Sequence, residues 1–197
     1  MLFRKLPWIA ALLMTMAVAD EGAAAGSPQV LMKTSMGEVV IELYPDKAPK
    51  TVDNFLKYVK SGFYSDTVFH RVINGFMIQG GGYPKSMYQG DMGRKENLPP
   101  IELESKNGLK NDTGWLAMAR TSVPNSATSQ FFINVTDNDM LNHPKPDGHG
   151  YAVFGKVIKG MEVVNAIKGV KTTRMGPMAD VPAEPVVIES ISLIGGK

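Results

Sequence analysis

The sequence of 197 residues contains no cysteine and only three histidines. The absence of cysteine excludes disulfide bonds, thiolate metal sites and an N-terminal cysteine that carries a lipid. His143 and His149 lie six positions apart, a spacing that is not typical of a metal site, and no third ligand lies near them in the sequence. We therefore expect no metal site.

The chain also has no basic run and little net charge, which is only +2. Nucleic-acid binding proteins usually concentrate positive charge on one face, so we do not expect this class of partner. Beyond the N-terminus there is no apolar segment as long as the roughly 20 residues that a membrane-spanning helix needs. The sequence therefore predicts one globular domain, residues 28–197.

Residues 1–25 have the features of a secretory signal peptide. Arg4 and Lys5 precede a mostly apolar run, and small residues follow at 17–19 and 23–25. We expect cleavage after residue 19 or 25. The alternative, an uncleaved membrane anchor, is disfavoured because the apolar run is too short. No contact with the membrane is expected after the signal peptide is removed.

Most of the remaining chain is predicted to form short strands. Apolar and β-branched runs alternate with segments that are rich in glycine and proline, and 83–108 and 138–150 are predicted loops. The predicted strands are 30–34, 38–44, 68–73, 76–79, 115–119, 131–135, 152–157 and 186–194. This pattern is typical of an all-β protein whose strands close into a barrel.

Two helices interrupt the strands. Val52, Phe55, Leu56 and Val59 follow helical spacing, and the second helix covers 161–167. We expect Thr51 to cap the N-terminus of the first helix and Gly62 to follow its end. Helices of this length typically cover the open ends of a barrel.

Residues 69–82 place one arginine and one glutamine among bulky apolar residues. Arg71 and Gln79 lie on strand-like runs on either side of Asn74-Gly75, a strong turn signal. An arginine in a strand is usually solvated, but a half-buried guanidinium needs a partner or a function. Three glycines follow, 80–82, without the Lys-Ser/Thr pair of a phosphate loop, so we interpret them as a site of close packing or a bend.

The sequence resembles the cyclophilins, a family of peptidyl-prolyl cis/trans isomerases, from about Val30 to Ile194. Three blocks carry the resemblance in order and spacing: Phe69-His70-Arg71-Val72-Ile73 with Phe76-Met77-Ile78-Gln79-Gly80-Gly81, then Gly114 to Arg120, then Ser129 to Ile133 with Tyr151 to Val157. The resemblance implies an eight-stranded closed antiparallel β-barrel capped by two α-helices. It also implies a monomeric enzyme that needs no cofactor and acts on proline-containing unfolded or flexible polypeptides.

The resemblance assigns catalytic roles to Arg71, Phe76 and Gln79. Rotation of an X-Pro bond is slow because of amide resonance, which sets a barrier of about 18–20 kcal/mol. The prolyl nitrogen regains a basic lone pair in the twisted state, so a donor aimed at it stabilises the transition state. Arg71 is our candidate donor. The resemblance further assigns substrate contacts to Met77, Ala119, Arg120, Gln130, Phe132, Met140, Leu141 and Tyr151.

Other polar residues are interpreted as structural. His70 lies beside Arg71 but is expected to be a buried strand residue. Ser126 and Ser129 have no histidine and carboxylate partners in the sequence, which argues against a serine hydrolase. Because no group of mid-range pKa takes part in the proposed chemistry, we expect a rate that is nearly constant from roughly pH 6 to 8.

Three residues differ from the best-known eukaryotic pattern of the family. Met140 replaces a usual tryptophan, Tyr151 a histidine and Arg120 an asparagine. Cyclosporin uses that tryptophan in the family, so we expect weak cyclosporin binding. Tyrosine at the histidine position resembles the bacterial secreted branch and, with the signal peptide, predicts a periplasmic isomerase that assists protein folding. The alternatives are a holdase chaperone that binds proline segments and a structural role in the cell envelope.

Overall fold

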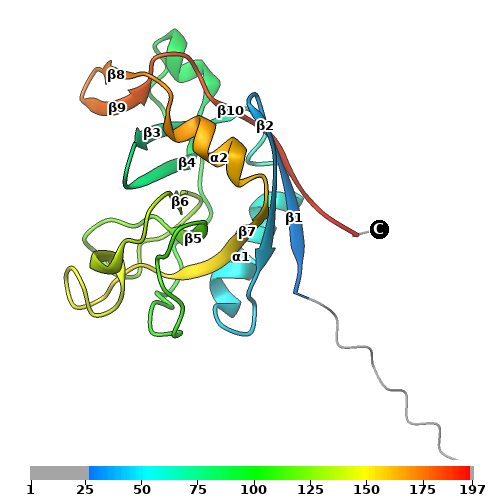
Figure 1. Ribbon diagram of the computed structural model, residues 1–197, viewed down its shortest axis with the longest axis vertical. Helices are drawn as coiled ribbons and strands as arrows, with labels where there is room; N and C mark the ends of the chain where they lie inside the picture. Colours follow the sequence, from blue (N-terminus) through cyan, green and yellow to red (C-terminus); the bar gives the residue numbers. More distant parts are fainter. Residues whose placement is uncertain (1–26, 196–197) are drawn as a thin grey trace, which may run out of the picture.

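The computed structural model describes residues 27–195, which form a closed antiparallel β-barrel of eight strands (Figure 1). The order around the barrel is β1-β10-β3-β4-β6-β5-β7-β2. The strands are β1 (Gln29–Thr34), β2 (Gly37–Leu43), β3 (Thr67–Ile73), β4 (Met77–Pro84), β5 (Trp115–Met118), β6 (Phe131–Asn134), β7 (Val153–Lys159) and β10 (Val187–Leu193). The predicted all-β fold is confirmed. The predicted signal peptide lies outside the described residues.

Side chains of one barrel wall, β3-β4-β6-β5, alternate between two faces because successive residues of a strand point to opposite sides. The row that belongs to the main hydrophobic core is Val72, Ile78, Ile133 and Leu116. The next row lies on the outer face and consists of Arg71, Gln79, Phe132 and Ala117. The wall therefore fills the barrel with one face and offers the candidate site residues on the other.

Helix α1 (Pro49–Lys60) packs against the barrel through Phe55, whose ring lies 5.2–5.8 Å from neighbouring core rings. Our assignment of Thr51 as its N-cap was wrong: the helix begins at Pro49 and Ala48 occupies the N-cap position. The first turn is capped instead by Glu104, whose carboxylate accepts hydrogen bonds from the backbone N–H groups of Lys50 and Thr51 and from the Thr51 hydroxyl. The carboxylate also matches the positive end of the helix dipole.

Helix α2 (Met161–Lys168) ends one residue later than predicted and buries Val164 and Ile167 completely. Both helices contribute to the same hydrophobic core as the barrel strands. Gly62 follows the end of α1 with φ +68°, which agrees with its expected place after the helix. Within residues 27–195, no helix is both long and apolar enough to cross a membrane.

Strand β4 continues to Pro84, five residues beyond its predicted end. The three glycines make this possible because they allow close contact with the core. A Cβ on Gly81, where φ is +81°, would lie 2.9 Å from the rings of Tyr64 and Phe131. The close packing expected at this run is therefore confirmed.

A second small sheet was not predicted. Strands β8 (Thr172–Met175) and β9 (Met178–Pro182) form a hairpin that packs beside β3 (Figure 1). Strand β8 is mostly exposed, and only the end of β9 is buried. Strands with so little buried surface need no alternation of apolar and polar residues, and the sequence of this hairpin shows none. The hairpin extends the outer face on which Arg71 lies.

Candidate active site

A cavity of about 120 Å³ lies on the outer face of the barrel wall. Its lining residues come from β3, the turn between β3 and β4, β4, β6, the segment after β5, a short 3₁₀ turn (Asp139–Leu141) and the segment before β7. They are Arg71, Phe76, Met77, Gln79, Ala119, Arg120, Phe132, Leu141 and Tyr151. The barrel topology thus brings together most of the site residues predicted from the sequence, with Gln130 and Met140 as the exceptions.

The polar side of the cavity follows from strand register. Gln79 pairs with Arg71 on β3 and with Phe132 on β6, so these three residues form one row across the wall. The Gln79 amide donates a hydrogen bond from Nε2 to Oε1 of Gln130 at 3.0 Å, which fixes its orientation. Its carbonyl oxygen can then accept a hydrogen bond from Arg71 or from a bound peptide. The Arg71 side chain is 43% exposed and accessible to a ligand on this face.

The other side of the cavity is apolar. Met77, Phe132 and Leu141 are buried, and the Tyr151 ring packs edge-on against Phe132 with centroids 5.7 Å apart. Phe76 is half-buried in the turn between β3 and β4. A surface of this kind favours a compact apolar ring over water, and it strengthens any polar interaction at its edge by lowering the local dielectric.

The guanidinium of Arg120 is engaged within the protein. Its side chain is only 1% exposed, and Nη2 donates to both carboxylate oxygens of Asp147 at 2.7 and 2.8 Å. Nε donates to the carbonyl oxygen of Gly150, and the cation lies 4.5 Å from the centre of the Tyr151 ring. The hydrogen bonds from Arg120 lower the pKa of Asp147 below its usual value. Arg120 therefore holds the loop before β7 and orients the aromatic wall of the cavity.

Gln130 and Met140 lie next to the cavity without lining it. Gln130 lines an adjoining polar depression that also includes Arg94 and shares Gln79, Ala119 and Arg120 with the cavity. Met140 is 57% exposed, whereas its neighbour Leu141 points inward and is buried. The structure thus places Met140 at the rim, and our assignment of it to the substrate-contacting surface remains a prediction.

A group of asparagines, of which Asn111, Asn134 and Asn138 are buried, supports the site and was missed in the sequence. Asn138 donates from Nδ2 to the carbonyl oxygen of Phe76 at 2.9 Å and to Oδ1 of Asn134 at 2.7 Å. Asn142 accepts a hydrogen bond from the backbone N–H of Asn111 at 2.7 Å. These bonds join the turn that carries Phe76 to the segment that carries Leu141. The one sequence signal was Asn134, an amide within an otherwise apolar strand.

His70 is buried on β3, next to Arg71 in the sequence, and its ring centroid lies 4.7 Å from that of Tyr83. Burial, together with the positive charge of Arg94, lowers the pKa of His70 to about 4. The imidazole is therefore neutral at pH 7. These observations agree with the structural role expected for His70.

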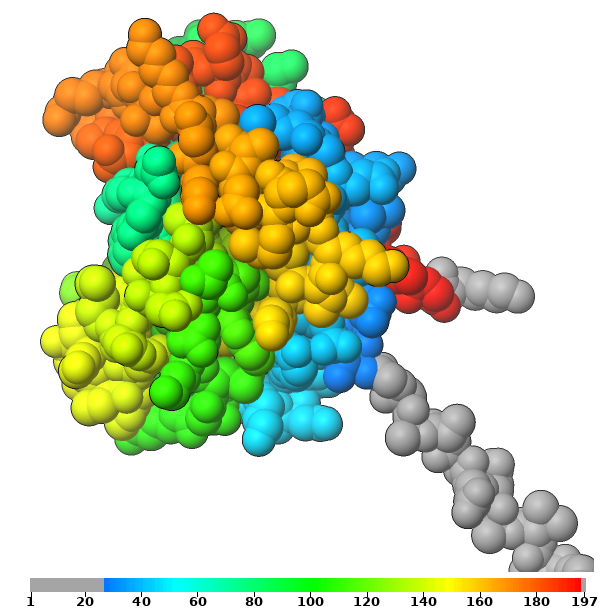
Figure 2. Space-filling model, in the orientation of Figure 1, coloured from blue at the N-terminus to red at the C-terminus, as the bar shows by residue number. Residues whose placement is uncertain are grey.

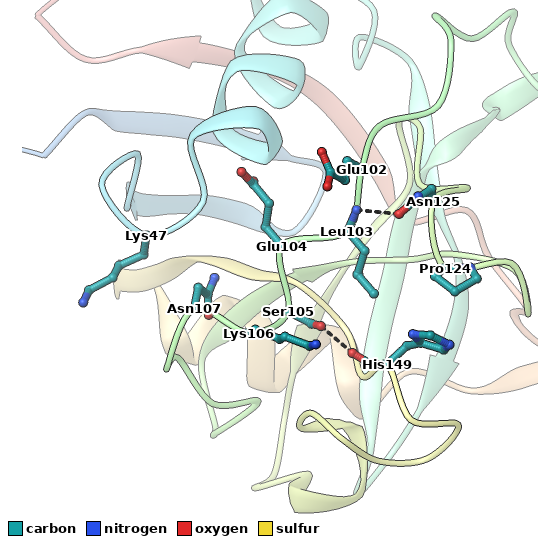
Figure 3. A pocket seen from close by; sticks show the side chains of 10 residues that line it. All are labelled: Lys47, Glu102, Leu103, Glu104, Ser105, Lys106, Asn107, Pro124, Asn125 and His149. Atoms are coloured by element: carbon teal, nitrogen blue, oxygen red, sulfur yellow. Dashed lines mark hydrogen bonds between the residues drawn. The ribbon is translucent and has the colours of Figure 1, made fainter.

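A larger and more open depression, of about 610 Å³, lies elsewhere on the surface (Figure 3). Three of its polar side chains have structural partners: Glu104 caps α1, Glu102 pairs with Lys50, and Ser105 donates to the carbonyl oxygen of His149. Size alone would favour this depression, but its chemistry offers no reactive arrangement. Among residues 27–195, no group of three histidine or carboxylate side chains could hold a metal ion.

The surface around the β3–β4 turn is open to solvent. Figure 2 shows the tip of this hairpin, in teal, between the orange β8–β9 hairpin and the yellow-green segment that follows β6. The cavity lining thus combines an exposed cation, an oriented amide and a buried aromatic floor on the outside of a closed barrel. This arrangement is chemically suited to a ligand with a compact apolar group next to a hydrogen-bond acceptor.

Comparison with known proteins gives the family. Residues 29–193 match the family described as cyclophilin type peptidyl-prolyl cis-trans isomerase/CLD. The chain is 56% identical over 168 residues to a peptidyl-prolyl cis-trans isomerase of Streptomyces antibioticus, which covers 84% of this chain and 98% of that one. It is 55% identical over 166 residues to peptidyl-prolyl cis-trans isomerase B of Escherichia coli strain K12, with 83% and 98% of the two chains covered.

Solved structures agree. A cyclophilin type isomerase from Cryptosporidium parvum superposes with a TM-score of 0.71 at 30% identity, with 87% of this chain and 99% of that one covered. A structure of the same protein in the presence of the dipeptide Ala-Pro gives a TM-score of 0.70 at 31% identity, over 85% and 99% of the two chains. The chain belongs to the cyclophilin-type peptidyl-prolyl cis-trans isomerases and is an enzyme of this activity.

Proposed function

We propose that this isomerase accelerates X-Pro rotation by donating a hydrogen bond from Arg71 to the prolyl nitrogen in the twisted transition state. The observation that carries the proposal is the row of Arg71, Gln79 and Phe132 across β3, β4 and β6, which places a permanent cation beside an apolar floor. The planar ground state offers no lone pair at this nitrogen, so the interaction strengthens only as the bond twists. That difference lowers the barrier.

The remaining residues hold the substrate while it rotates. The apolar floor of Phe132, Met77 and Leu141 holds the pyrrolidine ring, and the preceding acyl group is free to turn above it. Gln79, fixed by Gln130, accepts from the guanidinium or from the peptide backbone. Since each tenfold in rate needs only about 1.4 kcal/mol, one donor and one pocket suffice for several powers of ten.

The proposed setting is the periplasm, where the enzyme would act as a monomer on flexible or unfolded secreted polypeptides. Support comes from residues 1–25, with a short basic start, an apolar run and two candidate cleavage positions. When the full chain is produced in a Gram-negative host, we expect the mature protein in the periplasmic fraction. Mass spectrometry is expected to find its first residue at Asp20 or Gly26.

A control in which Arg4 and Lys5 are both replaced by glutamate is expected to reduce export, because the basic start of the signal is lost. Recovery of the unmodified chain in the cytoplasmic fraction, with residues 1–25 intact, would contradict the proposed localisation. The isomerase activity itself does not depend on this outcome.

Weak binding of cyclosporin is expected from the position of Met140. The Met140 side chain lies at the rim of the cavity and carries no hydrogen-bond donor, whereas the tryptophan usual in the family carries an indole N–H. Met140→Trp is expected to tighten cyclosporin binding by about tenfold, the value of one added hydrogen bond and its packing. Inhibition of X-Pro isomerisation gives the affinity.

Met140→Phe is the matched control for the cyclosporin experiment, since it adds an aromatic ring without a donor. It is expected to change the affinity by less than Met140→Trp does. Submicromolar inhibition of the wild-type enzyme by cyclosporin would show that the rim donor is not needed, and the expectation would fail.

A further inference from the structure

The β8–β9 hairpin brings a carboxylate to the candidate catalytic arginine. Asp180 of β9 places Oδ2 at 4.0 Å from Nε of Arg71, and the two side chains are exposed to a similar extent, 42% and 43%. Arg71 and Asp180 are far apart in the sequence and meet because β9 packs beside β3 (Figure 1). Among the residues that line the cavity itself there is no carboxylate.

The hairpin is anchored firmly enough to define where Asp180 lies. Val181, the next residue, is completely buried in a small cluster with Val68 and Val187 of the barrel. The Tyr88 hydroxyl donates a hydrogen bond to the carbonyl oxygen of Pro182 at 2.9 Å. Buried contacts immediately after Asp180 thus fix its backbone against β3, so the carboxylate faces Arg71 as a consequence of packing.

The backbone of Asp180 is in the left-handed region, with φ +61°. This conformation is uncommon for residues other than glycine, although aspartate and asparagine adopt it more readily than most. The residue therefore holds a carboxylate in a backbone position where glycine would be the least strained choice. An uncommon conformation beside a functional group is a reason to ask what its side chain does.

We propose that Asp180 is a positioning residue that orients the guanidinium of Arg71 for X-Pro isomerisation. The carboxylate attracts the guanidinium from its Nε side and leaves the terminal nitrogens directed at the cavity. At 4.0 Å the attraction acts without a direct hydrogen bond, so the donors of Arg71 stay available to the prolyl nitrogen. The positioning role rests on the proposed role of Arg71 and adds the residue that orients its guanidinium.

The test compares Asp180→Asn with the wild-type enzyme. Asparagine keeps the shape and tolerates the left-handed backbone, so the change removes only the charge. We expect kcat to fall about three- to tenfold with little change in KM, as befits a partly exposed ion pair. The difference between the two enzymes is expected to shrink in about 1 M salt, where such pairs are screened.

Three further measurements separate positioning from a general structural effect. Glu184→Gln, the same charge change at an exposed position after β9, is the matched control and is expected to leave kcat unchanged. Asp180→Glu is expected to restore part of the lost rate. The Nε–H resonance of Arg71 in ¹⁵N NMR spectra is expected to move in Asp180→Asn but not in Glu184→Gln.

The double variant that combines Asp180→Asn with Arg71→Ala separates a failure of the positioning role of Asp180 from a failure of the proposed role of Arg71. If Asp180 acts through Arg71, Asp180→Asn lowers the rate only when Arg71 is present. An unchanged kcat in Asp180→Asn, or an equal loss in the Arg71→Ala background, would overturn the positioning role. If Arg71→Ala alone keeps full activity, the proposed role of Arg71 itself fails, and the positioning role fails with it.

Discussion

Arg71→Ala is expected to lower kcat/KM for an X-Pro peptide by about 10²- to 10³-fold, the usual effect of removing a donor that stabilises transition-state charge. Arg71 lies on the outer face of the wall and is 43% exposed, so its loss leaves no cavity in the core. The free energy of unfolding is therefore expected to change by less than about 1 kcal/mol. A protease-coupled cis-to-trans assay and a urea titration measure the two quantities.

Arg71→Lys is the control for charge. Lysine keeps the cation but offers a flexible ammonium in place of the planar fork, so its activity is expected to fall between wild type and Arg71→Ala. Residual activity of Arg71→Ala within about threefold of wild type, in a protein of unchanged stability, would remove the arginine from the mechanism.

The second large effect is a loss of stability in mild acid that comes from His70. The folded pKa of His70 is about 4, whereas an exposed histidine titrates near its usual value of 6.5. Below pH 6.5 the unfolded chain binds a proton at His70 that the folded protein does not. The free energy of unfolding is therefore highest above pH 6.5 and falls as the pH drops towards 4. The difference between the two pKa values lowers the free energy of unfolding by about 2 kcal/mol between pH 7 and pH 5.

Urea unfolding at pH 7 and pH 5 measures the effect, with His70→Phe as the control that keeps a ring against Tyr83 and removes the titrating group. The variant is expected to lose about 2 kcal/mol less than wild type over this interval. Equal losses in the two proteins would show that His70 does not set the pH dependence. Catalysis by the folded enzyme is expected to stay nearly constant from about pH 6 to 8, since the lining residues include no histidine or carboxylate.

The barrel could be predicted from the sequence because its strands carry a local signal. Runs such as Val30–Thr34 and Phe131–Val135 are short, apolar and separated by turn residues. The family resemblance implied the closed eight-stranded barrel, but the order of the strands around it depends on long-range pairing and was not predicted. The β8–β9 hairpin has weak alternation and was missed, together with the carboxylate of Asp180 that it brings to Arg71.

Contacts across long stretches of chain explain the other differences. Threonine is a common N-cap residue, which is why Thr51 was expected to cap α1, but the first turn is capped by Glu104, a residue 53 positions from Thr51. Arg120 lines the cavity, and its predicted contact with substrate stays a prediction, but no sequence pattern indicated that Asp147 and Gly150 would bind its guanidinium. The family resemblance therefore indicated which residues meet at the cavity, whereas the contacts between loops that are distant in the sequence could not be predicted.

The most direct test of the central claim measures catalysis and binding on one sample. Two-dimensional NMR exchange spectra of a proline peptide, with the chain from residue 26 onward, give the cis–trans exchange rate on the enzyme and the affinity. For Arg71→Ala, the proposed mechanism predicts that the exchange rate falls about 10²-fold or more while the affinity stays within about threefold. Equal losses of rate and affinity, or binding by the wild type without any exchange, would contradict it and favour a protein that only holds proline segments.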